Sequence, residues 1–145
     1  NEHILELHGT ARKVSCLECG FVEMADPFVA HFLETERVPE CPQCTGILKH
    51  ATVSFGQSLP AEVLYQSATW SREADVYLAL GSSLVVTPAA DLPRMAVEHG
   101  AKLIIINRDP TPLDAIAQVV IHAPLGETLA AIDKALILRQ SSDAL

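Results

Sequence analysis

Residues 75–80 read DVYLAL and residues 102–107 read KLIIIN, and these two stretches indicate the fold class most clearly. Each contains a uniformly apolar run, as expected of a short strand that is covered on both faces. Residues 88–99, which lie between them, predict a helix with Gly100 just past its end. A strand, a helix and a second strand in this order predict a βαβ unit with parallel strands.

The flanking sequence continues this alternation. Residues 61–73 predict a helix with Pro60 near its start, and residues 127–138 predict a closing helix. Further strands are expected over residues 4–7, 51–55 and 119–123, and residues 141–145 are expected to form a frayed tail. The fold class is therefore α/β, with a parallel sheet that carries helices on both faces. The strands are few for such a sheet, so part of it is expected to be absent from this chain.

Composition excludes several classes of protein. The chain has 145 residues, of which 49% are hydrophobic and 19% charged, so it can bury one modest core and is not disordered. Its apolar runs are far shorter than the ~20 residues that cross a bilayer, and no secretory leader is evident. The net charge of −8 disfavours a nucleic-acid partner and favours a basic peptide. Reduced cysteines suit a cytoplasmic location, which we therefore expect.

Four cysteines form two Cys-x-x-Cys pairs, Cys16 with Cys19 and Cys41 with Cys44. The two-residue spacer lets both sulfurs of a pair face one ion, and the polar segment from residue 11 to 49 lacks a core of its own. Four cysteine ligands leave no open position, so the pattern predicts a structural zinc, with Gly20 and Gly46 at positive φ after each pair. Redox dithiols or unrelated core cysteines are the alternatives. A nucleic-acid zinc ribbon is disfavoured, since acidic residues outnumber basic ones here.

Several local signals occur in one order along the chain. They are ELHGT at residues 6–10, the four cysteines, FGQSLP at 55–60, GSSLVVTPAA at 81–90 and INRD at 106–109. This order closely resembles the sirtuins, the NAD-dependent protein-lysine deacylases, over nearly the whole chain. The resemblance implies a Rossmann-like domain that carries a small zinc module. It also implies that NAD and an acyl-lysine peptide meet in the cleft between the two.

The resemblance assigns catalysis to His8. This residue matches the family's general base, which activates the ribose hydroxyls after the acyl oxygen attacks the nicotinamide ribose, and imidazole titrates in a suitable range. Without this context, a lone histidine at a strand end is more simply a structural turn residue. The cofactor would contact residues that follow strands, where open α/β sheets bind ligands. The first of these residues are Gly81, Ser82 and Ser83. Asn107 and Asp109 would contact the adenosine ribose, although the family more often has Glu in place of Asp109. Leu125 would lie beside the adenine.

Two loops would hold the substrate. By resemblance the peptide adds as a β-strand between them, through main-chain hydrogen bonds that tolerate many sequences. One loop comprises Val53, Ser54, Phe55 and Gly56, and the other comprises Leu84, Val85 and Val86. Gln57 replaces the usual Glu, and Ser54 stands where an aromatic ring commonly lines the acyl-lysine tunnel. A roomier or more polar tunnel predicts that acetyl is not the preferred acyl group.

The resemblance also divides the chain. Residues 1–10 are expected to form a strand and the catalytic-histidine segment of the Rossmann-like domain, 11–50 the zinc-binding module, 51–140 the C-terminal portion of the NAD-binding domain and 141–145 a tail. The family's Gly-Ala-Gly phosphate loop and Thr-Gln-Asn-Ile-Asp segment, which precede the His-Gly motif, do not occur in this sequence. We therefore expect the chain to be inactive alone and to need its N-terminal half as a partner.

Other functions stay open beside the deacylase. The chain could be a non-catalytic module that binds peptide or NAD, a purely structural zinc-stapled partner, or part of an ADP-ribosyltransferase that uses the same cofactor. A histidine at the mouth of the cleft favours the enzyme over a binding module, and weakly favours deacylation over ADP-ribosyl transfer.

Overall fold

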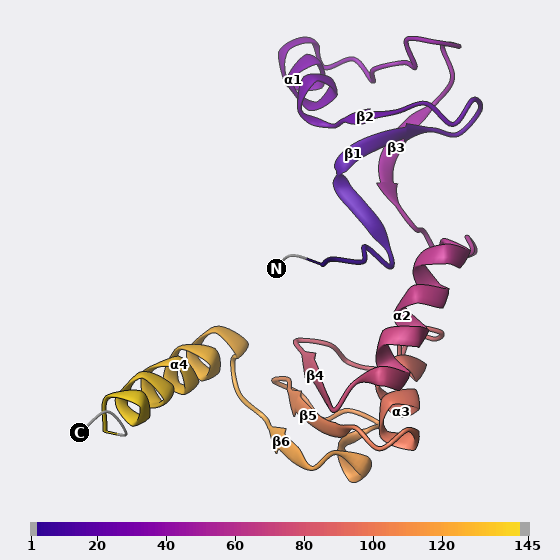
Figure 1. The fold of residues 1–145 in the computed structure, drawn as a ribbon. Helices are drawn as coiled ribbons and strands as arrows, with labels where there is room; N and C mark the ends of the chain where they lie inside the picture. The colour runs from indigo at the N-terminus through magenta and orange to yellow at the C-terminus, as the bar shows by residue number, and fades with distance from the viewer. Residues whose placement is uncertain (1–2, 143–145) are drawn as a thin grey trace. The chain divides into compact units, whose positions relative to one another are not determined.

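The structure is a computed structural model that describes residues 3–142. Contacts between residues divide the chain into two compact units, one up to Leu64 and the other from Tyr65 onward. Figure 1 follows the chain through both units, from the indigo N-terminal part to the yellow C-terminal helix. Helix α2 (Ala61–Glu73) contains the boundary between them. The domain limits expected at residues 10, 50 and 140 stay predictions.

The first unit is built on a small antiparallel sheet. Strands β1 (Gly9–Cys16), β2 (Val22–Met24) and β3 (Leu48–Thr52) pair in the order β2-β1-β3. Val14 of β1 lies opposite Glu23 on one side and His50 on the other. Helix α1 (Asp26–Thr35) follows β2 and has a proline in its first turn, where the missing N–H leaves no hydrogen bond unmade. The residue that caps the end of this helix, Glu36, has a left-handed φ of 56°.

Two strand predictions in this unit are wrong. The strand expected over residues 4–7 does not form, because residues 3–6 have no regular structure and β1 begins only at Gly9. The strand expected over residues 51–55 lies three residues earlier, as β3. Alternation of apolar residues is a local signal, whereas the pairing of β1 with β3 decides which residues enter the sheet.

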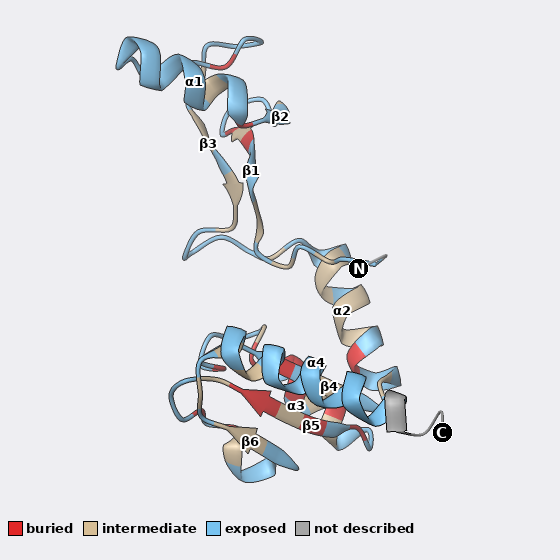
Figure 2. Ribbon diagram, turned by 90° about the vertical axis from the view of Figure 1, so that its left-hand side faces the viewer, coloured by how far each residue is buried: buried red, intermediate tan, exposed pale blue. Residues whose placement is uncertain are grey.

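Little apolar surface is buried in the first unit. Its buried residues are Val14, Ala25, Cys16 and Cys41. Helix α1 buries none of its residues, and its Phe32 and Leu33 are 46% and 74% exposed, as the pale blue of Figure 2 shows for most of the helix. Phe21 and Phe28 make an edge-on ring contact with centroids 6.4 Å apart. So small a core needs a further source of stability.

The second unit contains the parallel sheet that the sequence predicts. Strands β4 (Val76–Leu80), β5 (Lys102–Ile106) and β6 (Val119–Ile121) lie in the order β4-β5-β6 and pair in parallel. Helix α3 (Asp91–Glu98) connects β4 to β5 and packs against both strands. The short 3₁₀ helix η1 (Asp114–Ile116) precedes β6, and helix α4 (Leu125–Ser142) ends the described chain. The predicted α/β class and its βαβ unit are confirmed.

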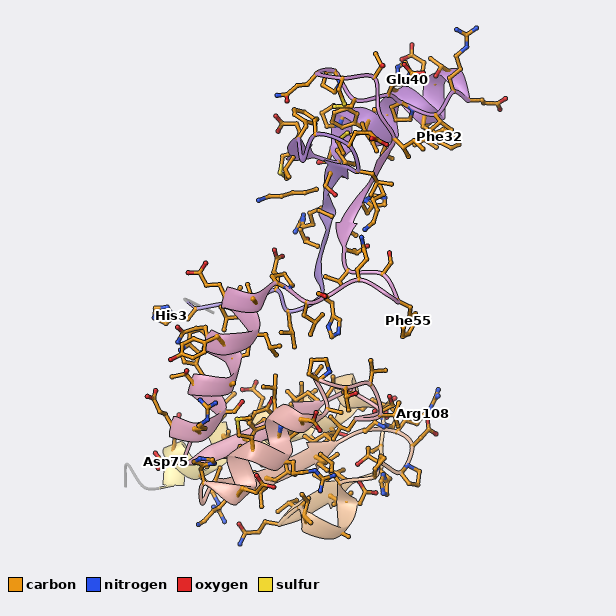
Figure 3. The ribbon with its side chains drawn as sticks, turned by 90° about the vertical axis from the view of Figure 1, so that its right-hand side faces the viewer. His3, Phe32, Glu40, Phe55, Asp75 and Arg108 are labelled. Carbon is orange, nitrogen blue, oxygen red and sulfur yellow. The ribbon has the colours of Figure 1, made fainter. Side chains whose placement is uncertain are left out.

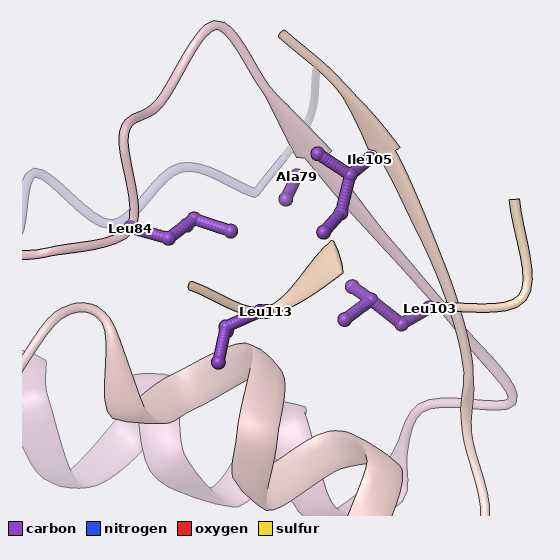
Figure 4. Packing of buried hydrophobic residues seen from close by; sticks show 5 residues of the cluster. All are labelled: Ala79, Leu84, Leu103, Ile105 and Leu113. Atoms are coloured by element: carbon purple, nitrogen blue, oxygen red, sulfur yellow. The ribbon is translucent and has the colours of Figure 1, made fainter. Parts of the chain in front are cut away.

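The core of the second unit lies on one face of this sheet. It consists of Ala79, Leu84, Leu103, Ile105 and Leu113, which Figure 4 shows from close by. The register sets Ala79 beside Ile105, so both point to the same face. Helices are expected on both faces of the sheet, and the described residues show α3 packed against β4 and β5. The alternate residues of β4, Val76, Leu78 and Leu80, are 48%, 56% and 39% exposed, so the other face of this strand is open to solvent.

The helix boundaries agree closely with the sequence pattern. Helix α2 covers the predicted residues 61–73. Helix α3 begins three residues later than expected, at Asp91, because the N–H of Asp91 donates to the carbonyl of Pro88 in a turn. Helix α4 extends beyond residues 127–138 at both ends and includes the start of the expected tail, whose residues 143–145 lie outside the described part. Among the described residues, no helix combines the length and apolar character that crossing a membrane requires.

Candidate functional site

Four cysteine sulfurs converge in the first unit. The Sγ atoms of Cys16, Cys19, Cys41 and Cys44 all lie within 4.8 Å of one another. Those of Cys16 and Cys44 are 3.5 Å apart, and those of Cys19 and Cys41 are 3.6 Å apart. A tetrahedral zinc with bonds of ~2.3 Å holds its sulfurs about 3.8 Å apart, whereas a disulfide would need about 2.05 Å. The four cysteines are therefore positioned to bind one structural zinc.

Both Cys-x-x-Cys pairs adopt the same kind of turn. The backbone N–H of Glu18 donates to the sulfur of Cys16, and that of Gln43 donates to the sulfur of Cys41, both at 3.4 Å. The hydrogen bond from Glu18 favours the thiolate form of Cys16 that a metal needs. The predicted spacing thus gives two matching turns that face each other across the cluster.

The glycines after the two pairs play different roles. Gly20 has a φ of 73°, as expected, but in the second turn the left-handed residue is Thr45, with a φ of 58°. The expectation for Gly46 is therefore wrong, because the second turn reaches the left-handed region one residue earlier. Gly46 is needed for close packing instead: a Cβ there would lie 3.1 Å from the sulfurs of both Cys16 and Cys44.

The thiols of the cluster do not ionise independently. A hydrogen bond from the backbone of Cys19 is the main cause that lowers the pKa of Cys16 to about 7. A backbone hydrogen bond from Gly46 also lowers the pKa of Cys44, but the neighbouring thiols of Cys19 and Cys16 outweigh it and raise that pKa to about 12. Four sulfurs this close cannot all carry negative charge without a cation among them. A divalent metal removes this repulsion.

The predicted catalytic residue lies beside the start of the predicted substrate loop. His8 is exposed in the turn before β1, and its carbonyl oxygen accepts a hydrogen bond of 2.8 Å from the N–H of Val53. The next residue, Gly9, pairs with Thr52 of β3. The same end of the antiparallel sheet therefore holds both segments.

The substrate loop that follows is open to solvent. Phe55 is 96% exposed, and Figure 3 shows its ring projecting from the chain. The N–H of Ser54 donates to the side-chain oxygen of Gln57 at 2.9 Å, and the N–H of Gln57 donates back to the carbonyl of Ser54 at 3.0 Å. Gln57, noted in the sequence only as a departure from the family, thus closes this turn. An open cavity borders the loop and is lined by Gly9, Ser15, Leu17, Lys49, Ala51, Thr52, Val53, Gln57, Ser58 and Pro60.

In the second unit, predicted cofactor residues meet at the carboxyl ends of β4 and β5. The N–H of Gly81 donates to the carbonyl of Ile106 at 2.9 Å, which sets Gly81 beside the residue before Asn107. A Cβ built on Gly81 would lie 3.3 Å from Cδ2 of Leu125. Gly81 thus has two neighbours from distant parts of the sequence, Ile106 and Leu125, at the edge where open α/β sheets bind ligands.

The loop after Gly81 divides into buried and exposed residues. Ser82 and Ser83 are exposed, and the Ser82 hydroxyl accepts a hydrogen bond of 3.4 Å from the N–H of Leu84. Leu84 has a left-handed φ of 53° and belongs to the buried core, so only its backbone can reach a ligand. Val85 and Val86 are 60% and 45% exposed and remain accessible to a peptide.

Asn107 and Asp109 begin the loop between β5 and η1. The Asn107 side-chain amide donates to the carbonyl of Asp109 at 2.8 Å. The Arg108 guanidinium, which Figure 3 shows at the surface, lies 3.0 Å from the Asp109 carboxylate, and this hydrogen-bonded ion pair raises the pKa of Arg108. Exposed ion pairs of this kind contribute little, so ribose hydroxyls can compete for the carboxylate.

Three residues that do not stand out in the sequence are joined next to this loop. The ring of His122, which follows β6, has Nδ1 3.3 Å from the carbonyl oxygen of Asn107 and Nε2 3.1 Å from Oδ2 of Asp114. Asp114 in turn accepts a hydrogen bond of 2.6 Å from the Thr111 hydroxyl. No motif signals this network, because its members come from separate elements.

Comparison with known proteins identifies the family. Residues 1–88 match the sequence model of the Sir2 family. The chain therefore belongs to the Sir2 family, and the resemblance to the sirtuins is confirmed. It is similar to solved structures described as "Sir2-p53 peptide-NAD+" (TM-score 0.85, 33% identity, 92% of this chain and 55% of that one) and "Sir2 bound to acetylated peptide" (TM-score 0.83, 33% identity, 90% and 55%).

Relatives whose names state an enzymatic activity match nearly the whole chain. It is 45% identical to "NAD-dependent protein deacetylase 2" of Streptomyces coelicolor, over 92% of this chain and 55% of the relative. It is 39% identical to "NAD-dependent protein deacylase 2" of Archaeoglobus fulgidus, over 89% of this chain and 51% of the relative. The chain thus spans about half the length of these relatives.

Proposed function

We propose that this chain is the C-terminal part of an NAD-dependent protein-lysine deacylase. It would supply the structural zinc module, the general base His8 and part of the sites for NAD and for the acyl-lysine peptide. The observation that carries the proposal is the hydrogen bond between the His8 carbonyl and the N–H of Val53, because it sets the predicted base beside the predicted substrate loop. Membership of the Sir2 family and the names of the relatives support the same activity.

The residues of the chain suit the expected roles. NAD, when bound, supplies the ribose that accepts the acyl group as nicotinamide is released. The exposed imidazole of His8 can take a proton from a ribose hydroxyl, as a general base that works near neutral pH. Gly81 lets the backbone approach the dinucleotide, while Asn107 and Asp109 offer an amide and a carboxylate to ribose hydroxyls.

The substrate is an acyl-lysine segment of another protein. The exposed Phe55 loop and the exposed Val85 and Val86 offer main chain to an extended peptide, a mode of binding that reads little sequence. Ser54, in place of a ring, favours acyl groups larger or more polar than acetyl. A reducing compartment such as the cytoplasm suits the four free thiols.

Activity would require the other half of the NAD site. Neither a Gly-Ala-Gly phosphate loop nor a Thr-Gln-Asn-Ile-Asp segment is present in these residues, so the chain alone would lack the pyrophosphate site and half of the nicotinamide-ribose site. The partner needed for turnover is an N-terminal half of the same family.

The test measures the release of deacylated peptide from acetyl-, propionyl- or succinyl-lysine peptides in the presence of NAD. We expect none from the chain alone, and release from the chain fused to the N-terminal half of the Streptomyces coelicolor relative. His8→Ala in the fusion should abolish release, whereas His31→Ala, which changes an exposed histidine of α1, should not. Release by the chain alone that depends on His8 would overturn the need for a second half. A folded, zinc-loaded fusion that binds peptide without any release would favour a binding module.

A further inference from the structure

His122 lies where it can hold the loop that carries Asn107 and Asp109. We propose that His122 is a positioning residue for nucleotide binding, and that its doubly protonated ring ties the Asn107 carbonyl to the Asp114 carboxylate. That the bound ligand is a nucleotide rests on the proposed function, whereas the link between Asn107 and Asp114 rests on the geometry of the His122 ring. In that geometry Nδ1 is 3.3 Å from the Asn107 oxygen and Nε2 is 3.1 Å from Oδ2 of Asp114.

The protonation state follows from the two partners of the ring. A backbone carbonyl can only accept a hydrogen bond, and an ionised carboxylate can only accept one as well. A neutral imidazole has one N–H, so it could donate to Asn107 or to Asp114 but not to both. Both contacts are satisfied together only by the imidazolium, which donates through both nitrogens.

The carboxylate side of this bridge is firmly held. Asp114 Oδ1 accepts a hydrogen bond of 2.6 Å from the Thr111 hydroxyl, and Oδ2 accepts one of 3.2 Å from the Thr111 N–H. These bonds lower the pKa of Asp114, so the group is anionic at neutral pH. Thr111 is buried, and Leu113 beside it belongs to the hydrophobic core. The bridge therefore anchors the Asn107 carbonyl to the core of the second unit.

The other side of the bridge reaches the predicted nucleotide site directly. The side chain of Asn107 donates to the carbonyl of Asp109 at 2.8 Å, so a shift of Asn107 moves both residues. Loss of a proton from the ring breaks one of the two contacts and frees the Asn107 peptide group. Nucleotide affinity should then fall as the pH rises through the range in which imidazole loses its charge.

The charges around the ring leave Asp114 as its partner. The charged residues of the neighbouring loop are Arg108 and Asp109, whose side chains form an ion pair with each other at 3.0 Å. The first turn of α4 contains one further acidic residue, Glu127. Among the described residues, Asp114 is the one acidic group that forms an ion pair with His122.

The first test observes the bridge without any ligand. In zinc-loaded chain labelled with ¹⁵N, the His122 ring nitrogens and the backbone amide of Arg108, which shares a peptide group with the Asn107 carbonyl, are followed by NMR from about pH 5.5 to about pH 8. We expect both ring nitrogens to be protonated at the acid end, and ring and amide to titrate with one midpoint. A ring that stays singly protonated throughout, or an Arg108 amide that does not respond, would overturn the inference.

The second test measures ADP-ribose binding by calorimetry over the same range, with the chain fused to the N-terminal half of the Streptomyces coelicolor relative. ADP-ribose has no group that titrates there, so a pH dependence belongs to the protein. Wild-type affinity should weaken about threefold to tenfold toward the alkaline end, the effect of losing one hydrogen bond of ordinary net strength. His122→Gln should bind with the weaker affinity at every pH, and the control His99→Gln, an exposed histidine at the end of α3, should keep the wild-type dependence.

The two tests separate the inference from the proposed function. A wild-type pH dependence retained in His122→Gln would overturn the role of His122, even though ADP-ribose binds. No ADP-ribose binding by any variant, with the coupled titration of ring and amide still present, would overturn the nucleotide role of the loop and leave the bridge itself supported.

Discussion

Replacing Gly9 by alanine tests the geometry that sets His8 beside the substrate loop. Gly9 has a φ of +68°, and a Cβ built there would lie 2.1 Å from the carbonyl oxygen of Ala51 and 3.2 Å from Cα of Thr52. These are backbone atoms, so no side-chain rotation can relieve the contact. Strands β1 and β3 must instead move apart at the end where the Val53 N–H meets the His8 carbonyl.

The size of the effect follows from two contributions. A left-handed backbone costs an alanine about 1 kcal/mol relative to glycine. The new methyl group falls about 1 Å or more short of an ordinary contact distance, and overpacking of this kind costs ~1–3 kcal/mol. Gly9→Ala should therefore lower the free energy of unfolding of the first unit by roughly 2–4 kcal/mol. Gly56→Ala is the matched control, because Gly56 has a φ of +86° with nothing within 4 Å of the added Cβ, and it should lower that free energy by about 1 kcal/mol.

The assay combines urea denaturation, followed by far-UV circular dichroism on the zinc-loaded protein, with amide hydrogen exchange. In Gly9→Ala we expect a lower urea midpoint than in Gly56→Ala and a loss of exchange protection at the Val53 amide. Equal free energies of unfolding in the two variants, with Val53 still protected in Gly9→Ala, would refute the close approach of β1 to β3 as the reason for this glycine.

Other predictions concern the metal, the core and pH. Cys41→Ser should abolish the binding of one zinc per chain seen by native mass spectrometry, since it removes a buried ligand, and an unchanged zinc content would contradict the four-cysteine site. Ile105→Ala, at a fully buried core position, should lower the free energy of unfolding by about 3 kcal/mol in urea, whereas Leu136→Ala, at a side chain that is 53% exposed, should change it by less than about 0.5 kcal/mol. Similar losses in both would show that this core is not formed. The Thr111 hydroxyl lowers the pKa of Asp114, so the ionised Asp114 carboxylate stabilises the folded state at pH values above the ordinary aspartate range. This stabilisation is lost as the pH falls through the lowered pKa. Asp114→Asn should flatten this acid loss of stability in thermal melts, and an unaltered acid profile would argue against the contribution.

Local sequence patterns predicted most elements of the second unit. The strand over residues 102–107 was expected from its apolar run and is β5 (Lys102–Ile106), and the helix over residues 61–73 is α2. These signals are local, because an apolar run or a helical repeat is complete within one segment. β1 (Gly9–Cys16) carries no such signal, since few of its side chains are buried and its partners come from elsewhere in the chain.

In the candidate site, as in the fold, the sequence predicted the features that depend on a local pattern of residues. The cysteine pairs are recognisable because metal ligands in a turn have a characteristic spacing. The left-handed residue of the second turn was misplaced, at Gly46 instead of Thr45, because glycine is a preference at such positions and not a requirement. The His122 bridge could not be expected, since it joins the end of β6 to η1 and to the end of β5.

The sequence alone determined the α/β class, the zinc cluster and membership of a family, because each depends on residue types at short spacing or on the order of motifs. Which of those residues meet depends on how the chain packs in three dimensions. The tertiary structure placed the His8 carbonyl on the Val53 N–H, turned the Leu84 side chain into the core and brought Gly81 beside Leu125. These contacts depend on strand pairing and packing between distant segments, and such long-range partners are chosen by the burial and hydrogen bonding of the folded chain as a whole.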